Sequence, residues 1–157
     1  MSLTPPTMQY KPSKQHSRVE KFMTTTHWRI ALFIWLLLIF IGSSGLLSFE
    51  NTEKFFFFSE RIHHAARKFA HIAEYAILTY LCFRSLWTKN RFTSCVLWSV
   101  LISILYAILD EYHQSFVPSR TGVWTDVVWD GTGVAIIILL LWYAKHRENG
   151  KIRQWIL

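Results

Sequence analysis

Polar and ionisable side chains gather at the ends of three apolar segments of this chain. Those that could bind a ligand or move a proton are Lys68, His71, Glu74 and Tyr75 in the first segment, Asp110, Glu111 and Gln114 in the second, and Arg120, Asp126 and Asp130 around the third. A charge at the centre of a bilayer costs ~2.5–3.5 kcal/mol on insertion scales, so such residues usually face the interior of a helix bundle. Their number predicts a functional site inside the protein.

In the first segment, the spacing favours acid–base chemistry. Lys68, His71 and Tyr75 lie at i, i+3 and i+7, so they share one helical face, and Glu74 borders it. A carboxylate beside an imidazole can orient the ring and raise its basicity, as proton transfer requires. The alternative is structural, with the lysine reaching to the membrane surface and the other two residues satisfying each other.

In the second segment, carboxyl and amide groups share a helix end. Asp110 and Gln114 are one turn apart, and Glu111 is adjacent. Two neighbouring carboxylates repel each other unless a cation neutralises them, and Lys68, Arg120 or a divalent ion could do so. Oxygen ligands suit Mg²⁺, Mn²⁺ or Ca²⁺, although the spacing matches no fixed metal motif. A divalent cofactor and plain hydration of the acids both stay open.

In the third segment, Asp126 and Asp130 lie at i, i+4, where like charges repel. Because this repulsion destabilises a helix, a purely structural role for the pair is unfavourable, and a binding role is favoured. Arg120, in the preceding turn, offers a bidentate fork for a phosphate or for a carboxylate of the protein itself. Gly131 and Gly133 would let another helix or a lipid headgroup approach closely.

The elements that must position these residues are transmembrane helices. Hydrophobic residues make up 52% of the 157 residues and charged residues 17%, against about 25% charged in soluble domains. We expect an all-α, polytopic transmembrane bundle, because a span needs about 20 apolar residues. The predicted spans are residues 28–48, 65–86, 92–116 and 123–144, with an amphipathic helix in the membrane interface near 54–64.

The predicted organisation is one transmembrane domain, 28–145, between a disordered cytoplasmic tail, 1–27, and a basic cytoplasmic tail, 146–157. Twelve of the seventeen lysines and arginines lie in the N-terminal segment through Arg29, in the turn 84–91 and in the C-terminal segment 145–157. Because positive loops stay inside, both termini should be cytoplasmic, which turns all three polar helix ends outward.

Two other classes of function fit poorly. The net charge of +7 could suggest nucleic-acid binding, but the basic residues lie in short clusters between apolar segments, as in cytoplasmic loops. A transporter would need polar groups through the full depth of the membrane. The opposite halves of the segments, 78–83, 92–105 and 134–141, carry few. Cys82 and Cys95 are expected to be small core residues without a disulfide.

The polar positions resemble those of the VanZ-like family. The matching motifs are Arg67-Lys68-x-x-His71-x-x-Glu74-Tyr75, then Asp110-Glu111-x-x-Gln114-x-Phe116-x-Pro118-x-Arg120, and then Asp126-x-x-x-Asp130-x-x-Gly133. The resemblance covers roughly residues 30–145; Ser119 stands where the family often has glycine. It implies a bacterial inner-membrane protein of four or five helices, and the founding member is linked to low-level resistance to glycopeptides such as teicoplanin.

Two functions remain. In the first, the pocket binds or alters an outer-leaflet envelope component, a membrane lipid or lipid-linked precursor, and so contributes to glycopeptide resistance. In the second, the protein is a membrane enzyme acting on a lipid-linked phosphate or headgroup. The residues assigned to the chemistry are His71, Glu74, Glu111 and Asp126, and those assigned to binding are Lys68, Tyr75, Asp110, Gln114, Arg120 and Asp130. The oligomeric state is left open.

Overall fold

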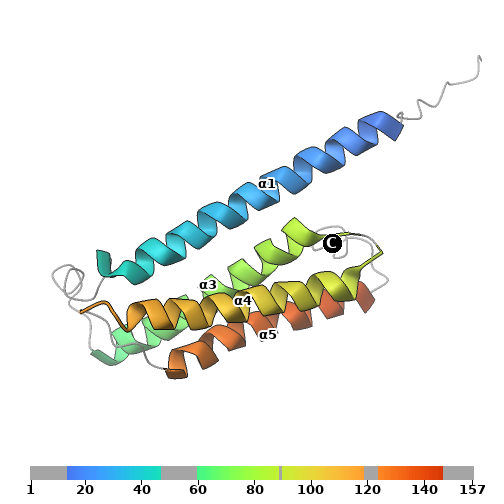
Figure 1. The fold of residues 1–157 in the computed structure, drawn as a ribbon. Helices are drawn as coiled ribbons and strands as arrows, with labels where there is room; N and C mark the ends of the chain where they lie inside the picture. The colour runs from blue at the N-terminus through green and yellow to red at the C-terminus, as the bar shows by residue number, and fades with distance from the viewer. Residues whose placement is uncertain (1–13, 47–59, 89, 119–123, 147–157) are drawn as a thin grey trace, which may run out of the picture.

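The chain is a bundle of long helices in the computed structural model, which describes residues 14–46, 60–88, 90–118 and 124–146 (Figure 1). The helices are α1 (Lys14–Ile41), α3 (Glu60–Leu86), α4 (Phe92–Gln114) and α5 (Trp124–His146), and a π-helical turn, η1 (Gly42–Leu46), extends α1. Every element of the described residues is helical, which confirms the all-α class.

Three helices are long and apolar enough to cross a membrane. They are Thr25–Ser44, which is the second half of α1 with part of η1, and the whole of α4 and of α5. At 1.5 Å per residue the 23 residues of α4 reach about 35 Å, slightly more than the ~30 Å of hydrocarbon in a bilayer. Their length and composition are those of a membrane protein.

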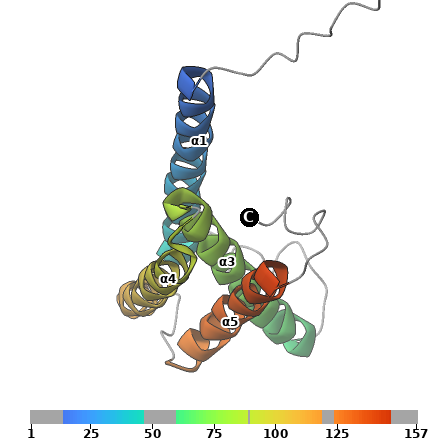
Figure 2. The ribbon, with the colours of Figure 1, turned by 90° about the vertical axis from the view of Figure 1, so that its right-hand side faces the viewer.

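Helix α3, expected as a fourth span, is not among these apolar helices. Arg67, Lys68, Glu74 and Arg84 interrupt it. It is the central helix instead, because it packs against α1, α4 and α5 (Figure 2). Polar side chains on such a helix can face protein rather than lipid, so α3 does not need the composition of a lipid-facing span.

The N-terminal boundary also differs from expectation. Disorder was predicted through residue 27, but α1 begins at Lys14. No glycine or proline follows Pro12 before the apolar part of the helix, and extending an existing helix is far easier than nucleating one. Of the expected amphipathic helix near 54–64, residues 54–59 lie outside the described residues, and 60–64 are the first residues of α3. The tail 147–157 is outside them too.

The interior of the bundle mixes apolar and polar side chains, whereas its outside is largely apolar. Buried polar side chains are Ser43, His71, Thr79, Ser85, Ser99, Ser103, Asp110, Glu111, Gln114 and Asp130. Large apolar side chains point outward at the same time: Phe33, Leu97 and Leu139 are 63%, 64% and 69% exposed. Such an apolar surface is unfavourable in water but favourable in lipid, because lipid tails solvate apolar side chains. Polar groups in a membrane instead pair with one another between helices.

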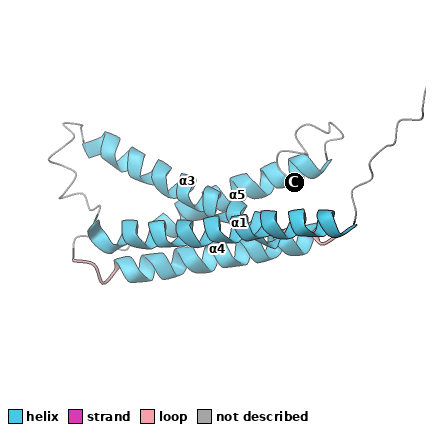
Figure 3. Cartoon of the chain, turned by 90° about the horizontal axis from the view of Figure 1, so that it is seen from above, coloured by secondary structure: helices cyan, strands magenta, loops and turns pink. Residues whose placement is uncertain are grey.

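Helices α3 and α5 make the closest backbone approach, at Gly133. A Cβ atom there would collide with the carbonyl oxygen of Ile72 and lie 2.9 Å from the backbone nitrogen of Ala76. Figure 3 shows the two helices crossing and diverging from one another. Tyr75 and Val134, next to this contact, belong to the buried core. Only a residue without a side chain allows the two helices to come this close.

We therefore expect Gly133→Val to destabilise the bundle by about 1–3 kcal/mol, because the added side chain must push α5 away from α3. The matched control is Gly131→Ala, since a Cβ at Gly131 meets nothing within 4 Å. The free energy of unfolding of that control should stay within about 0.5 kcal/mol of the value for the parent chain. Unfolding of the purified protein by sodium dodecyl sulfate gives both values. Equal stabilities for the two variants would contradict the close crossing.

Candidate functional site

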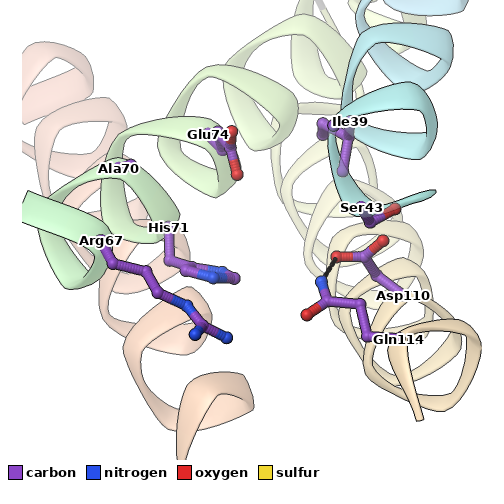
Figure 4. Close-up of a pocket in the computed structure, with 9 residues that line it drawn as sticks. Ile39, Ser43, Arg67, Ala70, His71, Glu74, Asp110 and Gln114 are labelled. Atoms are coloured by element: carbon purple, nitrogen blue, oxygen red, sulfur yellow. Dashed lines mark hydrogen bonds between the residues drawn. The ribbon is translucent and has the colours of Figure 1, made fainter. Parts of the chain in front are cut away.

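A cavity of about 160 Å³ opens where α1 ends, α3 begins and α4 ends. Its lining residues are Ile39, Gly42 and Ser43 of α1 and η1, Arg67, Ala70, His71 and Glu74 of α3, and Asp110 and Gln114 of α4. In Figure 4, Arg67 and His71 extend from α3 toward the two α4 side chains across the cavity. The space is far larger than the roughly 10–15 Å³ that one water molecule needs, so it can admit a polar group of several atoms.

His71 is held by a carboxylate from another helix. Its Nδ1 lies 3.0 Å from Oδ1 of Asp130 on α5, and both side chains are buried. A carboxylate accepts, so the ring Nδ1–H donates, which leaves the other ring nitrogen for the cavity that His71 lines. The sequence suggested Glu74 as the orienting partner; the hydrogen bond at Nδ1 is made with Asp130. A histidine oriented in this way can accept or donate a proton at its second nitrogen.

Arg67 makes a second link between the same two helices. Its Nη2 lies 3.3 Å from Oδ2 of Asp126, at the rim of the site where the arginine side chain is 36% exposed. The i, i+4 pair Asp126 and Asp130 therefore meets the i, i+4 pair Arg67 and His71 across the α3–α5 contact. Each carboxylate faces one basic group, which relieves the repulsion that the spacing of the two aspartates would create.

The α4 wall of the cavity carries hydrogen-bond acceptors. Gln114 donates from Nε2 to Oδ2 of Asp110 at 2.8 Å, and both residues are buried (Figure 4). Gln114 is only 1% exposed, and its Oε1 has no hydrogen-bond partner. A buried acceptor left without a donor is unfavourable by roughly 1–3 kcal/mol, so this wall is built to meet a donor.

Helix α1 closes the cavity. One hydrogen bond joins it to α3 and another joins it to α4, and in each a side chain donates to a backbone carbonyl. Nε1 of Trp35 donates to the carbonyl oxygen of Glu74 at 3.1 Å, and the hydroxyl of Tyr106 donates to that of Leu36 at 2.8 Å. Interhelical hydrogen bonds of this kind contribute about 0.6 kcal/mol each in membranes. They place Ile39 and Ser43 against the cavity.

Three other predicted site residues, Lys68, Glu111 and Tyr75, do not line the cavity. The Nζ of Lys68 sits over the ring of Trp129, 4.8 Å from its centroid, and does not line the cavity. Glu111 is buried beside a separate cavity of about 140 Å³ with Tyr112, Ser115 and Trp124. Tyr75 is fully buried in the core, where its hydroxyl has no hydrogen-bond partner. Arg120 falls outside the described residues.

Two contributions were missing from the sequence prediction of the site. Arg67 stands four residues before His71, so the same face periodicity that selected His71 points to it. The α1 wall had a weaker signal, because Gly42 and Ser43 interrupt an apolar helix near its end and coincide with the π-helical turn. Local widening of a helix into a π turn often marks a functional site.

The described residues do not hold a ready-made metal centre. No group of three or more histidine, cysteine, aspartate or glutamate side chains is arranged among them to hold a metal ion. Glu74 and Asp110 are the carboxylates that line the cavity, and hard divalent cations prefer about six oxygen ligands. The donor set in this part of the chain does not fit Mg²⁺ or Ca²⁺, so the metal alternative gains no support.

Three apolar helices of spanning length, with a polar cavity between α1, α3 and α4, are the features of a helical membrane protein. The family-model comparison makes the class specific: the model described as VanZ/LLP1 matches residues 5–145. The chain belongs to this family, since the match covers most of its length. No curated protein and no solved structure matches the chain.

The His71–Asp130 pair should be strongly coupled. Asp130→Ala is expected to destabilise the protein by about 1–3 kcal/mol, because it leaves a buried ring N–H without its acceptor. The double variant His71→Ala with Asp130→Ala should lose less than the sum of the single variants, by about 0.5–3 kcal/mol. Titration with sodium dodecyl sulfate measures each value.

Asp126→Ala is the matched control. It removes a carboxylate on the same helix one turn away, but from a pair whose arginine is 36% exposed. Its effect should stay under about 1 kcal/mol. Strictly additive losses in the double variant would show that the pair is not a single unit.

Proposed function

We propose that this protein binds the polar headgroup of a membrane lipid or of a lipid-linked envelope precursor. The observation that carries the proposal is the cavity between α1, α3 and α4, which brings donor side chains of α3 opposite acceptor side chains of α4 and also has the carboxylate of Glu74 in its lining. Ala70, among the lining residues, is exposed, so the cavity communicates with the surface of the bundle. A headgroup could enter while its acyl chains stay against the apolar surface of the helices.

The proposed site faces the outside of a bacterial inner membrane, with both chain ends in the cytoplasm. The distribution of lysine and arginine supports this orientation, because the end of the bundle opposite the cavity carries the basic turn around Arg91 and the last turn of α5 with Lys145. From this position the protein would bind or alter an outer-leaflet component and so contribute to teicoplanin-type resistance, as membership in the family suggests.

A second candidate, an enzyme acting on a lipid-linked phosphate or headgroup, is favoured by one observation. The His71 imidazole, oriented by Asp130 at 3.0 Å, lines the cavity in the arrangement that general acid–base catalysis uses. Asp130 takes the orienting role suggested for Glu74. Glu74 and Asp110 line the same cavity and could position a hydroxyl or water.

The orientation is testable by cysteine labelling. In a chain whose two buried cysteines, Cys82 and Cys95, are replaced by alanine, Ser115→Cys places a thiol at the cavity end and Asn90→Cys at the other end. We expect a membrane-impermeant maleimide to label the Ser115 variant in intact cells. The Asn90 variant should react only after permeabilisation. The opposite pattern would place the cavity on the cytoplasmic side and remove the outer-leaflet proposal.

Binding is testable by the lipids that stay bound during purification. Arg67→Ala and Gln114→Ala should each lower the retained lipid by roughly fivefold or more, since each removes a charged or buried hydrogen-bond partner. Lys145→Ala is the matched control, because it removes a positive charge at the opposite end of the bundle. Native mass spectrometry counts the bound lipids. Equal loss in all three variants, or none, would contradict a headgroup site in this cavity.

His71 separates the binding function from the enzyme. His71→Gln keeps a polar side chain but cannot relay a proton at physiological pH. For a binding protein, glycopeptide sensitivity and the lipid extract of a deletion strain restored with this variant should match those of the strain restored with the parent chain. For an enzyme, the variant should resemble the deletion strain while lipid retention stays normal. Unchanged lipids and sensitivity in the deletion strain itself would exclude both roles.

A further inference from the structure

The charges of the cavity are divided unevenly between its walls. On α3, Arg67 is paired with Asp126 and His71 with Asp130, so each basic group already faces a carboxylate. On α4, Asp110 is 7% exposed, and its one hydrogen bond is from the neutral amide of Gln114. An ionised carboxylate that is buried without a cation is strongly unfavourable. The α4 wall therefore attracts positive charge, whereas Arg67 and His71 on α3 are already paired with carboxylates. Glu74 of α3 lines the same cavity and brings a further carboxylate.

The hydrogen-bonding capacity of the cavity divides in the same way. Oε1 of Gln114 is buried without a partner, and the carboxylate of Asp110 has acceptor sites left after one bond. On α3, Nε of Arg67 is buried without a partner, and His71 uses one of its two ring nitrogens on Asp130. The α4 wall therefore favours a ligand group that carries positive charge and N–H donors. The other can still donate to an anionic oxygen.

Resting on the headgroup-binding function proposed above, we infer that the ligand is a zwitterionic headgroup carrying a primary ammonium and a phosphate. The ammonium binds between Asp110 and Gln114, because its three N–H groups can serve both acceptors at once. The phosphate lies toward Arg67, whose guanidinium has donors beyond the one on Asp126. A purely anionic headgroup would leave the α4 wall without a cation.

A metal ion meets the α4 wall less well than an ammonium. A divalent ion needs several oxygen ligands in one shell, and no group of three or more histidine, cysteine, aspartate or glutamate side chains among the described residues is arranged to hold one. An ammonium needs only hydrogen-bond acceptors at about 2.7–2.9 Å, and those of Asp110 and Gln114 are in place one helical turn apart. A quaternary ammonium carries the same charge but no N–H, so it cannot replace the primary amine.

The test compares three lipids on the purified full-length protein. Short-chain phosphatidylethanolamine, phosphatidylcholine and phosphatidylglycerol share a phosphate and differ in the group attached to it. We expect phosphatidylethanolamine to bind roughly tenfold more tightly than either of the others, because hydrogen bonds to charged groups are the strong ones. Soluble phosphoethanolamine should compete with it, which would separate recognition of the headgroup from burial of acyl chains.

Two variants assign the preference to the α4 wall. Asp110→Asn keeps the shape of the side chain and an oxygen for Gln114 but removes the charge, and should reduce the preference to about twofold or less. Gln114→Met removes the second acceptor but keeps a side chain of similar volume. It should weaken the binding of phosphatidylethanolamine and leave the binding of the other two lipids unchanged. Tyr112→Phe is the control, since Tyr112 lies on the same helix and is 64% exposed. Circular dichroism confirms that each variant is folded.

The outcomes separate the two proposals. Equal binding of all three lipids that is lost in Arg67→Ala would overturn the ammonium subsite and leave the headgroup site intact. Preference for phosphatidylethanolamine that survives Asp110→Asn would also overturn it. If no lipid binds in a way that depends on the cavity residues, the proposed function fails with it. Stimulation of binding by Ca²⁺ or Mg²⁺ and its loss with a chelator would show a metal in place of the ammonium.

Discussion

The contact between α3 and α5 at Gly133 is the constraint on which the polar end of the bundle depends. Since no side chain stands between Gly133 and the backbone around Ile72, the helices lie close enough for His71 to reach Asp130 at 3.0 Å and for Arg67 to reach Asp126 at 3.3 Å. A wider crossing would lengthen both contacts together and leave charges without partners in a place of low dielectric constant. The backbone approach and the side-chain pairs thus stabilise each other.

Helix α3 shows how an apolar bundle keeps a polar element. It packs against α1, α4 and α5, and its buried positions include Tyr75 and Thr79 beside Leu78 and Phe83. The outer helices expose their apolar side chains instead, as α1 does along most of its spanning part. A central helix shielded in this way can carry the charged residues of a site, because the other helices replace lipid around it.

The pairing of charges bears on both candidate functions. Since Arg67 and His71, the two basic residues that line the cavity, already face carboxylates, the cavity is poorly suited to hold a bare anion by charge alone. The oriented imidazole suits proton transfer, and the acceptors on α4 suit a ligand that brings donors. Binding and catalysis would use the same walls of the cavity in different ways.

Local properties of the sequence were enough for several conclusions. Uninterrupted apolar segments predict α4 and α5, and periodicity puts His71 with Arg67, and Asp126 with Asp130, on single faces, because these features depend only on neighbours along the chain. The family follows from motifs of the same kind. The partners across helices could not be predicted: that His71 meets Asp130, that Lys68 leaves the cavity for Trp129, and that α1 supplies Ser43 all depend on how the helices cross. Crossing angles and distances arise from packing between segments far apart in the chain, and only the tertiary structure decides them.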